Sequence, residues 1–309
     1  MMKTMSCLVS VLTLSLLSAA ATPLDQTRIS ADAKWVLHLD GDRFKTNQLG
    51  AFLIDQLLDK KLAKAKADLQ REFGFTLDWR KIQSITAYGT TYQKNDPSGL
   101  LIVESGLEVE SLLQKLIERK LPVAQVEKIE GPRQPIYRLN KDIYLSVLKG
   151  GMLLLSKSQP VIEHGQAILA GSKPNLGTAN LLKAYPETPS GFFFLAVAED
   201  FARLTKLPPN AAILKQAEGG RLTLGEQGGQ LRLNLDLRAK SAEVAQQIKQ
   251  VAEGLVSMAA LYADQHPDLK LVIQGASASV TDRLLTLGLE LPMDEVVKKL
   301  AKTGGPAKK

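Results

Sequence analysis

Three residues near the start of the chain carry side chains from which a metal or acid–base site could be built: His38, Asp40 and Asp42. His38 and Asp40 lie two residues apart in an alternating segment, so on a strand both point to one face, opposite Leu37 and Leu39. An imidazole and a carboxylate are ligands that zinc or iron accepts. A third ligand must come from elsewhere, and no second histidine motif supplies it. The sequence therefore defines an incomplete candidate for a metal site.

The same trio has two other interpretations. Asp40-Gly41-Asp42 matches a fragment of a calcium-binding loop, without the later ligands or the closing glutamate. Alternatively, His38 and Asp40 belong to a hydrogen-bonded polar face, and the aspartate caps the turn that follows. Short motifs match by chance in many sequences, so we favour this structural interpretation and predict no cofactor.

Other catalytic motifs are missing from the sequence. Gly-x-Ser-x-Gly is absent, and Ser84, Ser105 and Ser146 have no histidine near them in sequence. The loop from Gly171 to Gly177 lacks the Gly-Lys-Ser/Thr ending of a phosphate-binding loop. Paired carboxylates for glycoside hydrolysis need only proximity in space, so a hydrolase stays open as an alternative.

The first 21 residues have the composition of an export signal. Lys3 precedes a largely apolar run from Leu8 to Leu17, and small residues precede Thr22. A basic start, an apolar run and small residues at the cleavage position are typical of a secretory signal peptide. The run is shorter than the roughly 20 apolar residues that span a bilayer. We predict cleavage after Ala21 and a periplasmic or secreted protein.

The composition of the predicted mature chain excludes several functions. The single cysteine, Cys7, lies inside the predicted signal, which excludes disulfides and cysteine-metal sites. Of the 39 basic residues, Lys3 lies in the predicted signal; the remaining 38 basic and 32 acidic residues give a formal charge of +6. Aromatic residues are scarce and do not alternate with lysines, so we predict no nucleic-acid partner. The predicted partners are an envelope protein or an anionic envelope surface, with no transmembrane segment in the mature chain.

Hydrophobic periodicity predicts an α+β fold. Residues 35–40 alternate as a strand, and apolar residues at three- and four-residue steps predict a helix from Leu49 to Phe73, ended by Gly74. Leu231 to Leu237 alternates leucines with polar residues, the pattern of an antiparallel sheet. We expect amphipathic helices on one face of such sheets. The other predicted strands are 82–92, 100–104, 135–139, 143–148, 152–156, 192–198, 221–226, 269–279 and 284–291, and the other predicted helices are 108–120, 161–169, 201–217, 242–265 and 293–302.

The two halves of the chain have a similar order of predicted elements. Both end in a hairpin, a proline and a short helix, in residues 145–165 and again in 278–300. This similarity predicts a tandem duplication of one α+β unit. The predicted organisation, in order, is a signal peptide (1–21), a first lobe (22–175), a second lobe (176–302) and a disordered lysine-rich tail (303–309).

The opening segment also carries a resemblance to known proteins. Residues Ala31 to Asp40 read Ala-Asp-Ala-Lys-Trp-Val-Leu-His-Leu-Asp, directly after the predicted signal. This segment resembles exported bacterial proteins of unknown function from planctomycete- and verrucomicrobium-like genomes, in which an Ala-Asp-Ala-x-Trp-Val-x-His-x-Asp strand leads into a helix. The resemblance implies an exported location and this strand–helix opening, and it implies no activity and no site.

Together these observations predict a non-enzymatic exported protein that binds another macromolecule or serves as a structural module. A carrier of an apolar, lipid-like ligand is the alternative, because sheets with helical lids can enclose such ligands. Leucines of 231–237 and 285–291 would then line the cavity. A hydrolase or metal enzyme built around His38, Asp40 and Asp42 is the third hypothesis.

Overall fold

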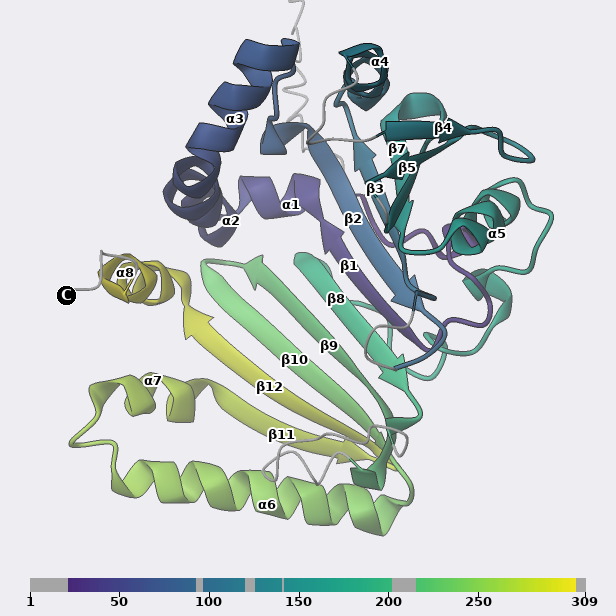
Figure 1. Ribbon diagram of the computed structural model, residues 1–309. Coiled ribbons are helices and arrows are strands. Elements are labelled where there is room, and N and C mark those ends of the chain that lie inside the picture. Colours follow the sequence, from purple (N-terminus) through teal and green to yellow (C-terminus); the bar gives the residue numbers. More distant parts are fainter. Residues whose placement is uncertain (1–21, 93–96, 120–125, 141, 202–214, 304–309) are drawn as a thin grey trace, which may run out of the picture.

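The computed structural model describes residues 22–92, 97–119, 126–140, 142–201 and 215–303. Its twelve described strands form one antiparallel sheet in the order β11-β12-β10-β9-β8-β1-β2-β3-β7-β6-β5-β4 (Figure 1). The strands are β1 (Trp35–Asp40), β2 (Ile82–Gly89), β3 (Leu100–Ser105), β4 (Val126–Ile129), β5 (Ile136–Leu139), β6 (Ile143–Val147), β7 (Met152–Ser156), β8 (Phe192–Glu199), β9 (Ala217–Gln227), β10 (Gln230–Ala239), β11 (Ala276–Thr281) and β12 (Leu284–Pro292). The predicted α+β class and its antiparallel pairing are therefore confirmed.

Helices fill the connections between these strands. They are α1 (Gly41–Thr46), α2 (Gln48–Leu53), α3 (Asp59–Phe73), α4 (Val109–Arg119), α5 (Gln159–Leu169), α6 (Ala242–Leu261), α7 (Pro267–Gly275) and α8 (Met293–Thr303). A π-helical segment, Ile54–Leu58, joins α2 to α3. Gly74 ends α3 in the left-handed conformation, with φ of 63°, which a residue without Cβ adopts at no steric cost. None of the helices in the described residues is long and apolar enough to span a bilayer.

The strand order is the same on both sides of the central β1–β8 pair. Outward from β1 the order is β2, β3, β7 and β6, and outward from β8 it is β9, β10, β12 and β11. In each half, a first hairpin is followed by a helix and later by a second hairpin that pairs beside it, but only the first half inserts two further strands, β4 and β5, which extend its edge of the sheet. A duplicated unit would produce this arrangement, but the duplication and the boundary at 175/176 stay predictions.

In the N-terminal half, helices pack on both faces of the sheet. Ile162 of α5 packs with Leu100 and Leu154, whereas Leu113 of α4 packs with Leu153. Successive residues of a strand point to opposite faces, so Leu153 and Leu154 place the two helices on opposite sides. The expectation that helices lie on one face only is therefore wrong for this half.

In the C-terminal half, the two faces differ in polarity. Ile248 of α6 packs against Leu237 and Leu285 on one face. On the other face, Arg221 of β9 and Asp236 of β10 are paired in register, and Asp236 is next to Thr286 of β12. Figure 1 shows α6 lying along β11 at this end of the sheet.

Several predicted boundaries need correction. Residues 269–279 are not one strand: α7 extends to Gly275 and β11 begins at Ala276. Pro267 begins this helix, where its missing N–H leaves no bond unmade, and the short apolar run after it fits a helix as well as a strand. Strand β9 begins at Ala217, four residues before its predicted start. The predicted signal peptide, most of the 201–217 helix and the tail after Thr303 lie outside the described residues.

Candidate functional site

The structure brings His38, Asp40 and Asp42 together around Thr22. The Nε2 atom of His38 lies 3.0 Å from the carbonyl oxygen of Thr22. The backbone N–H of Thr22 donates to Oδ2 of Asp40 at 3.0 Å. The Thr22 hydroxyl donates to Oδ2 of Asp42 at 3.1 Å. Each of the three sequence-predicted residues therefore binds a different polar group of the same residue, which the sequence did not indicate.

Asp40 also ends β1 and caps α1. Its Oδ1 accepts a hydrogen bond of 3.0 Å from the Arg43 backbone N–H, one of the donors that a helix leaves unpaired at its start. The Arg43 guanidinium Nε lies 3.4 Å from Oδ2 of Asp40. The capping role considered from the sequence is thus present, and both carboxylate oxygens have partners within the chain.

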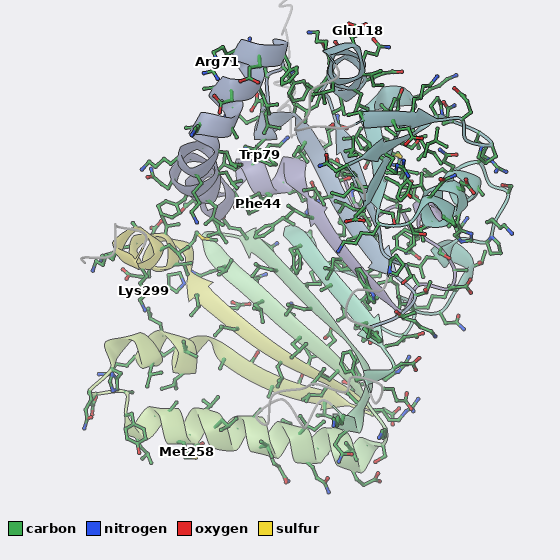
Figure 2. The ribbon with its side chains drawn as sticks, in the orientation of Figure 1. Phe44, Arg71, Trp79, Glu118, Met258 and Lys299 are labelled. Carbon is green, nitrogen blue, oxygen red and sulfur yellow. The ribbon has the colours of Figure 1, made fainter. Side chains whose placement is uncertain are left out.

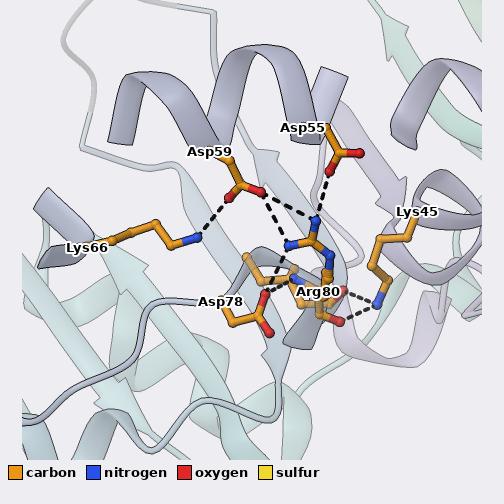
Figure 3. A network of polar contacts seen from close by, with 7 residues as sticks. Lys45, Asp55, Asp59, Lys66, Asp78 and Arg80 are labelled. Atoms are coloured by element: carbon orange, nitrogen blue, oxygen red, sulfur yellow. Dashed lines mark hydrogen bonds and ion pairs between the residues drawn. The ribbon is translucent and has the colours of Figure 1, made fainter. Parts of the chain in front are cut away.

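Lys45 forms an ion pair with Asp42, the other carboxylate of the cluster. Its Nζ lies 2.6 Å from Oδ1 of Asp42. The same ammonium donates to the carbonyl oxygens of Arg80, at 2.7 Å, and Ile82, at 3.1 Å (Figure 3). Asp42 is therefore held in place by a lysine that connects α1 to the start of β2.

His38 is a buried, neutral imidazole with both nitrogens bonded. A carbonyl oxygen can only accept, so Nε2 carries the proton toward Thr22, and Nδ1 accepts from the Thr86 hydroxyl at 2.9 Å. Burial lowers the pKa of His38, against smaller raising effects of the Thr22 carbonyl and the charges of Asp40 and Glu104. No lone pair of this ring is left for a metal ion or for proton transfer.

A second set of acidic residues lies on the surface beside α3, and its members form ion pairs with basic residues of the chain. The Arg80 guanidinium is 2.8 Å from Asp55, 3.4 Å from Asp59 and 3.8 Å from Asp78, and Lys66 is 2.8 Å from Asp59 (Figure 3). Exposed pairs of this kind contribute at most about 1 kcal/mol each. Among the residues that the structure describes, no cluster of three histidines, cysteines or acids could hold a metal ion.

A cavity of about 480 Å³ lies beside His38 and Asp40, on the same face of the sheet. Arg221, one of several charged residues that line it, is 5% exposed and pairs with Asp236, 4% exposed, at 2.6 Å. Arg221 also donates to the Pro186 carbonyl and lies 5.4 Å from the ring centre of Tyr185. Burial raises the pKa of Tyr185 to about 12, so this phenol stays protonated. The buried charge of Arg221 is thus satisfied internally.

A row of apolar side chains crosses the opposite face of the sheet from β5 to β11. Each strand contributes one residue, and directly paired residues share a face. We call this the apolar row; it consists, in order, of Tyr137, Leu145, Leu155, Leu101, Ala87, Leu37, Ala196, Leu222, Leu235, Leu287 and Ala278. Helix α4 covers one end and α6 packs on the other. In the middle, Leu37 stays 42% exposed.

An open groove of about 530 Å³ lies over the middle of the apolar row. Trp35, Leu37, Leu222 and Leu235 line it. The indole N–H of Trp35 donates to the backbone carbonyl of Thr91 at 2.9 Å, so it presents no free donor to the groove. The alternation within 35–39 and within 231–237 predicted an apolar face on each of these two strands. It did not predict that the two faces line the same groove.

Helix α6 carries a second uncovered apolar surface. Val251, Leu255, Met258 and Tyr262 are all exposed and recur at three- and four-residue steps, so they share one side of the helix. We call these four residues the α6 stripe. Leu255 is 62% exposed, and Met258, which is labelled on α6 in Figure 2, is 59% exposed. Like the groove over the apolar row, this exposed apolar surface had no motif in the sequence that indicated it.

The fold defines an α+β protein built on one antiparallel sheet, with helices on both faces and an uncovered apolar region on one of them. Solved structures of TP0453 share this architecture. Crystal form I has a TM-score of 0.50 at 7% sequence identity, covering 91% of this chain and 98% of that chain. Crystal form IV has a TM-score of 0.50 at 10% identity, covering 92% and 98%. At these identities the likeness shows the fold alone. No protein-family model and no curated protein matches the sequence.

Proposed function

We propose that this chain is a non-enzymatic exported protein, periplasmic or secreted, that binds a protein partner through the α6 stripe. The observation that carries the proposal is the exposure of Leu255 and Met258 in the middle of a helix. Contiguous apolar surface on a folded protein marks sites of interaction. Residues 254–261 contain no charged side chain that would keep this surface in water. Ile248, one turn before Val251, is buried against the sheet and already attaches the helix to it.

The charges around the stripe favour a protein partner over an anionic membrane. Helices that lie on anionic lipid carry lysine and arginine on their polar side. The polar residues of α6 near the stripe are instead the neutral Gln246, Gln247 and Gln250, and its Lys249 is paired with Glu253 at 3.0 Å. An apolar helix side with neutral flanks fits a hydrophobic groove on another protein.

The state of the His38 cluster supports a non-enzymatic role. Its imidazole and both carboxylates are bound by the chain itself, through Thr22, Arg43 and Lys45. A catalytic or metal site would need at least one of these groups to face a substrate or an ion. The export signal predicted in residues 1–21 supports the location.

Site-specific crosslinking tests the protein-binding proposal. A photoreactive residue would replace Leu255 in one variant and Gln250, a polar residue of α6 outside the stripe, in a matched control. In cells of the host we expect a discrete protein adduct from position 255 that disappears when Met258→Glu is added, and no adduct from position 250. Equal crosslinking from both positions would refute the proposal, as would products containing only lipid or a second copy of the chain.

A carrier of an apolar ligand is the second candidate, and the groove of about 530 Å³ favours it. Sites for small ligands have roughly 300–1,000 Å³ and mostly apolar walls. Ala196→Phe would fill the groove without opening a cavity elsewhere. We expect native mass spectrometry to find a lipid-sized adduct on the wild type and none on Ala196→Phe, if the groove carries a ligand. A bare wild-type chain purified from its own host would exclude the carrier.

A further inference from the structure

We propose that the His38–Asp40–Asp42 cluster is the binding site for the new amino terminus that forms when the chain is cleaved between Ala21 and Thr22. The inference rests on the export proposed above, since the cleavage is removal of the predicted signal peptide. The cluster is then an internal receptor for a processed end of the chain.

The geometry points to the Thr22 nitrogen as the group that is recognised. It lies 3.0 Å from Oδ2 of Asp40, a carboxylate in a residue that is 3% exposed. The Thr22 hydroxyl and carbonyl are fixed by Asp42 and His38, so three separate contacts set the position of this one residue. Threonine at this position therefore has a defined register relative to β1.

Cleavage changes the chemistry of this contact. Before cleavage the Thr22 nitrogen is an amide with a single hydrogen. A signal peptidase adds water across the Ala21–Thr22 peptide bond, so that Ala21 leaves with a carboxylate and the Thr22 amine takes up a proton. The resulting ammonium donates to the same Asp40 oxygen, so a hydrogen bond with one charged partner becomes an ion pair in which donor and acceptor are both charged.

The two carboxylates of the cluster have cations at different distances. Lys45 lies 2.6 Å from Asp42, whereas the cation beside Asp40 is Arg43. The Arg43 contact to Asp40 is the longer, at 3.4 Å, and this arginine is partly exposed. The carboxylate of Asp40 can therefore take an ammonium at 3.0 Å as its nearest charged partner.

Two independent observations meet at the same bond. The small residues before Thr22 predict cleavage after Ala21 from the sequence alone. The hydrogen bonds of Thr22 to β1 and α1 place the nitrogen of that bond against a buried carboxylate. One residue more at the start would move the ammonium by about 3.8 Å, beyond contact with Asp40.

A thermodynamic cycle tests the docking. The mature chain would be released by a sequence-specific protease so that it starts at Thr22, or at Ala21 as a one-residue extension, each with Asp40 intact or as Asp40→Asn. Asparagine still caps α1, so the substitution removes mainly the charge. We expect the extension to lower Tm by about 3 °C or more when Asp40 is present, and by less than about 1 °C in Asp40→Asn. Equal effects in both backgrounds would overturn the proposal.

Asp25→Asn is the matched control, because Asp25 also accepts hydrogen bonds from a threonine, Thr27, whereas the hydrogen bonds of Thr22 go to Asp40, Asp42 and His38. The extension should lower Tm in this variant as much as in the wild type. Acylation of the α-amino group gives a readout that needs no variant of Asp40. We expect it to be about tenfold slower in the chain that starts at Thr22 than in the extended chain, and equal rates would contradict the proposal.

The mass of the protein isolated from its host separates this inference from the proposed function. A chain that starts at Thr22 supports both the export and the inference. A chain that keeps residues 1–21 overturns the inference and the proposed export together. A processed chain that starts elsewhere overturns the inference alone, and so does a failed cycle on a chain that starts at Thr22.

Discussion

The two halves of the sheet share one strand order but bury their surfaces in different ways. In the first half, Leu153 and Leu154 point to opposite faces, and each lies in an apolar core under its own helix. In the second half, Arg221 and Asp236 occupy one face as a buried ion pair, and α6 covers only part of the other. The strand order alone does not decide where a binding surface lies. The side chains on each face decide it, because they determine which helix can pack there.

The largest difference between the halves is expected at the buried ion pair. Asp236→Ala leaves the Arg221 guanidinium buried without its carboxylate, which should cost about 3–5 kcal/mol of unfolding free energy. Urea unfolding measures the loss. The paired replacement Arg221→Met with Asp236→Leu should restore most of it, because two apolar side chains leave no buried charge. Arg232→Ala, on the same face of β10, is the reference substitution. The comparison would be contradicted if Asp236→Ala lowered the unfolding free energy no more than Arg232→Ala does.

Core substitutions in the first half should rank next. Leu154→Ala, at a fully buried position, should cost about 2–5 kcal/mol in urea unfolding because it leaves a cavity under α5. Leu37→Ala, in the uncovered middle of the apolar row, should cost less than Leu154→Ala, about 1 kcal/mol, since 42% of its surface is already in contact with water. Similar losses at both positions would show that the groove over Leu37 is filled in solution.

The α6 stripe should contribute little to folding. We expect Leu255→Ala to change the unfolding free energy by no more than about 0.5 kcal/mol, because the leucine is exposed. Ile248→Ala, at a buried position of the same helix, is the control and should cost about 2 kcal/mol or more. Thermal unfolding followed by circular dichroism distinguishes the two. A large loss at Leu255 would mean that the stripe serves the fold rather than a partner.

A smaller effect is expected from pH at the junction of the halves. Burial lowers the pKa of His38, so the unfolded chain takes up this proton at a higher pH than the folded chain. The contribution of His38 is complete above the unfolded value of about 6.5 and is lost as pH falls toward the folded value. The urea midpoint of the wild type should therefore fall more steeply below about pH 6.5 than that of His38→Gln. Parallel curves would mean that His38 titrates alike in both states.

Local features of the fold could be predicted from the sequence, and long-range ones could not. Alternation placed His38 and Asp40 on one face, and Gly74 marked the end of α3. The apolar run after Pro267 could not separate helix from strand, because it is too short to show a period. The apolar row depends on the register of ten strand pairs, and alternation within one strand does not reveal its partners.

The ion pair is an intermediate case. Strands 221–226 and 231–237 were predicted as a hairpin, and in the structure its turn consists of the two residues Gly228 and Gly229. Counting outward from this two-residue turn pairs Arg221 with Asp236, whereas a three-residue turn at 227–229 would pair Arg221 with Leu235. The hairpin was therefore indicated by the sequence, but its register was not. The contact of Thr22 with the His38 cluster had no such signal, because no turn or periodicity connects residue 22 to the end of β1.

The central β1–β8 pair also sets an order of events during synthesis. One edge of β1 can pair with β2 once residue 89 is made, whereas the other edge stays open until β8, ending at Glu199, has followed. A chain that stops before Phe192 would keep that edge unpaired, as a template for another strand. β1 pairs with β8 antiparallel, so two such fragments can pair β1 to β1 about a two-fold axis. We expect the isolated first half to be a strand-paired dimer, with the second half of the full chain acting as the cap that prevents it.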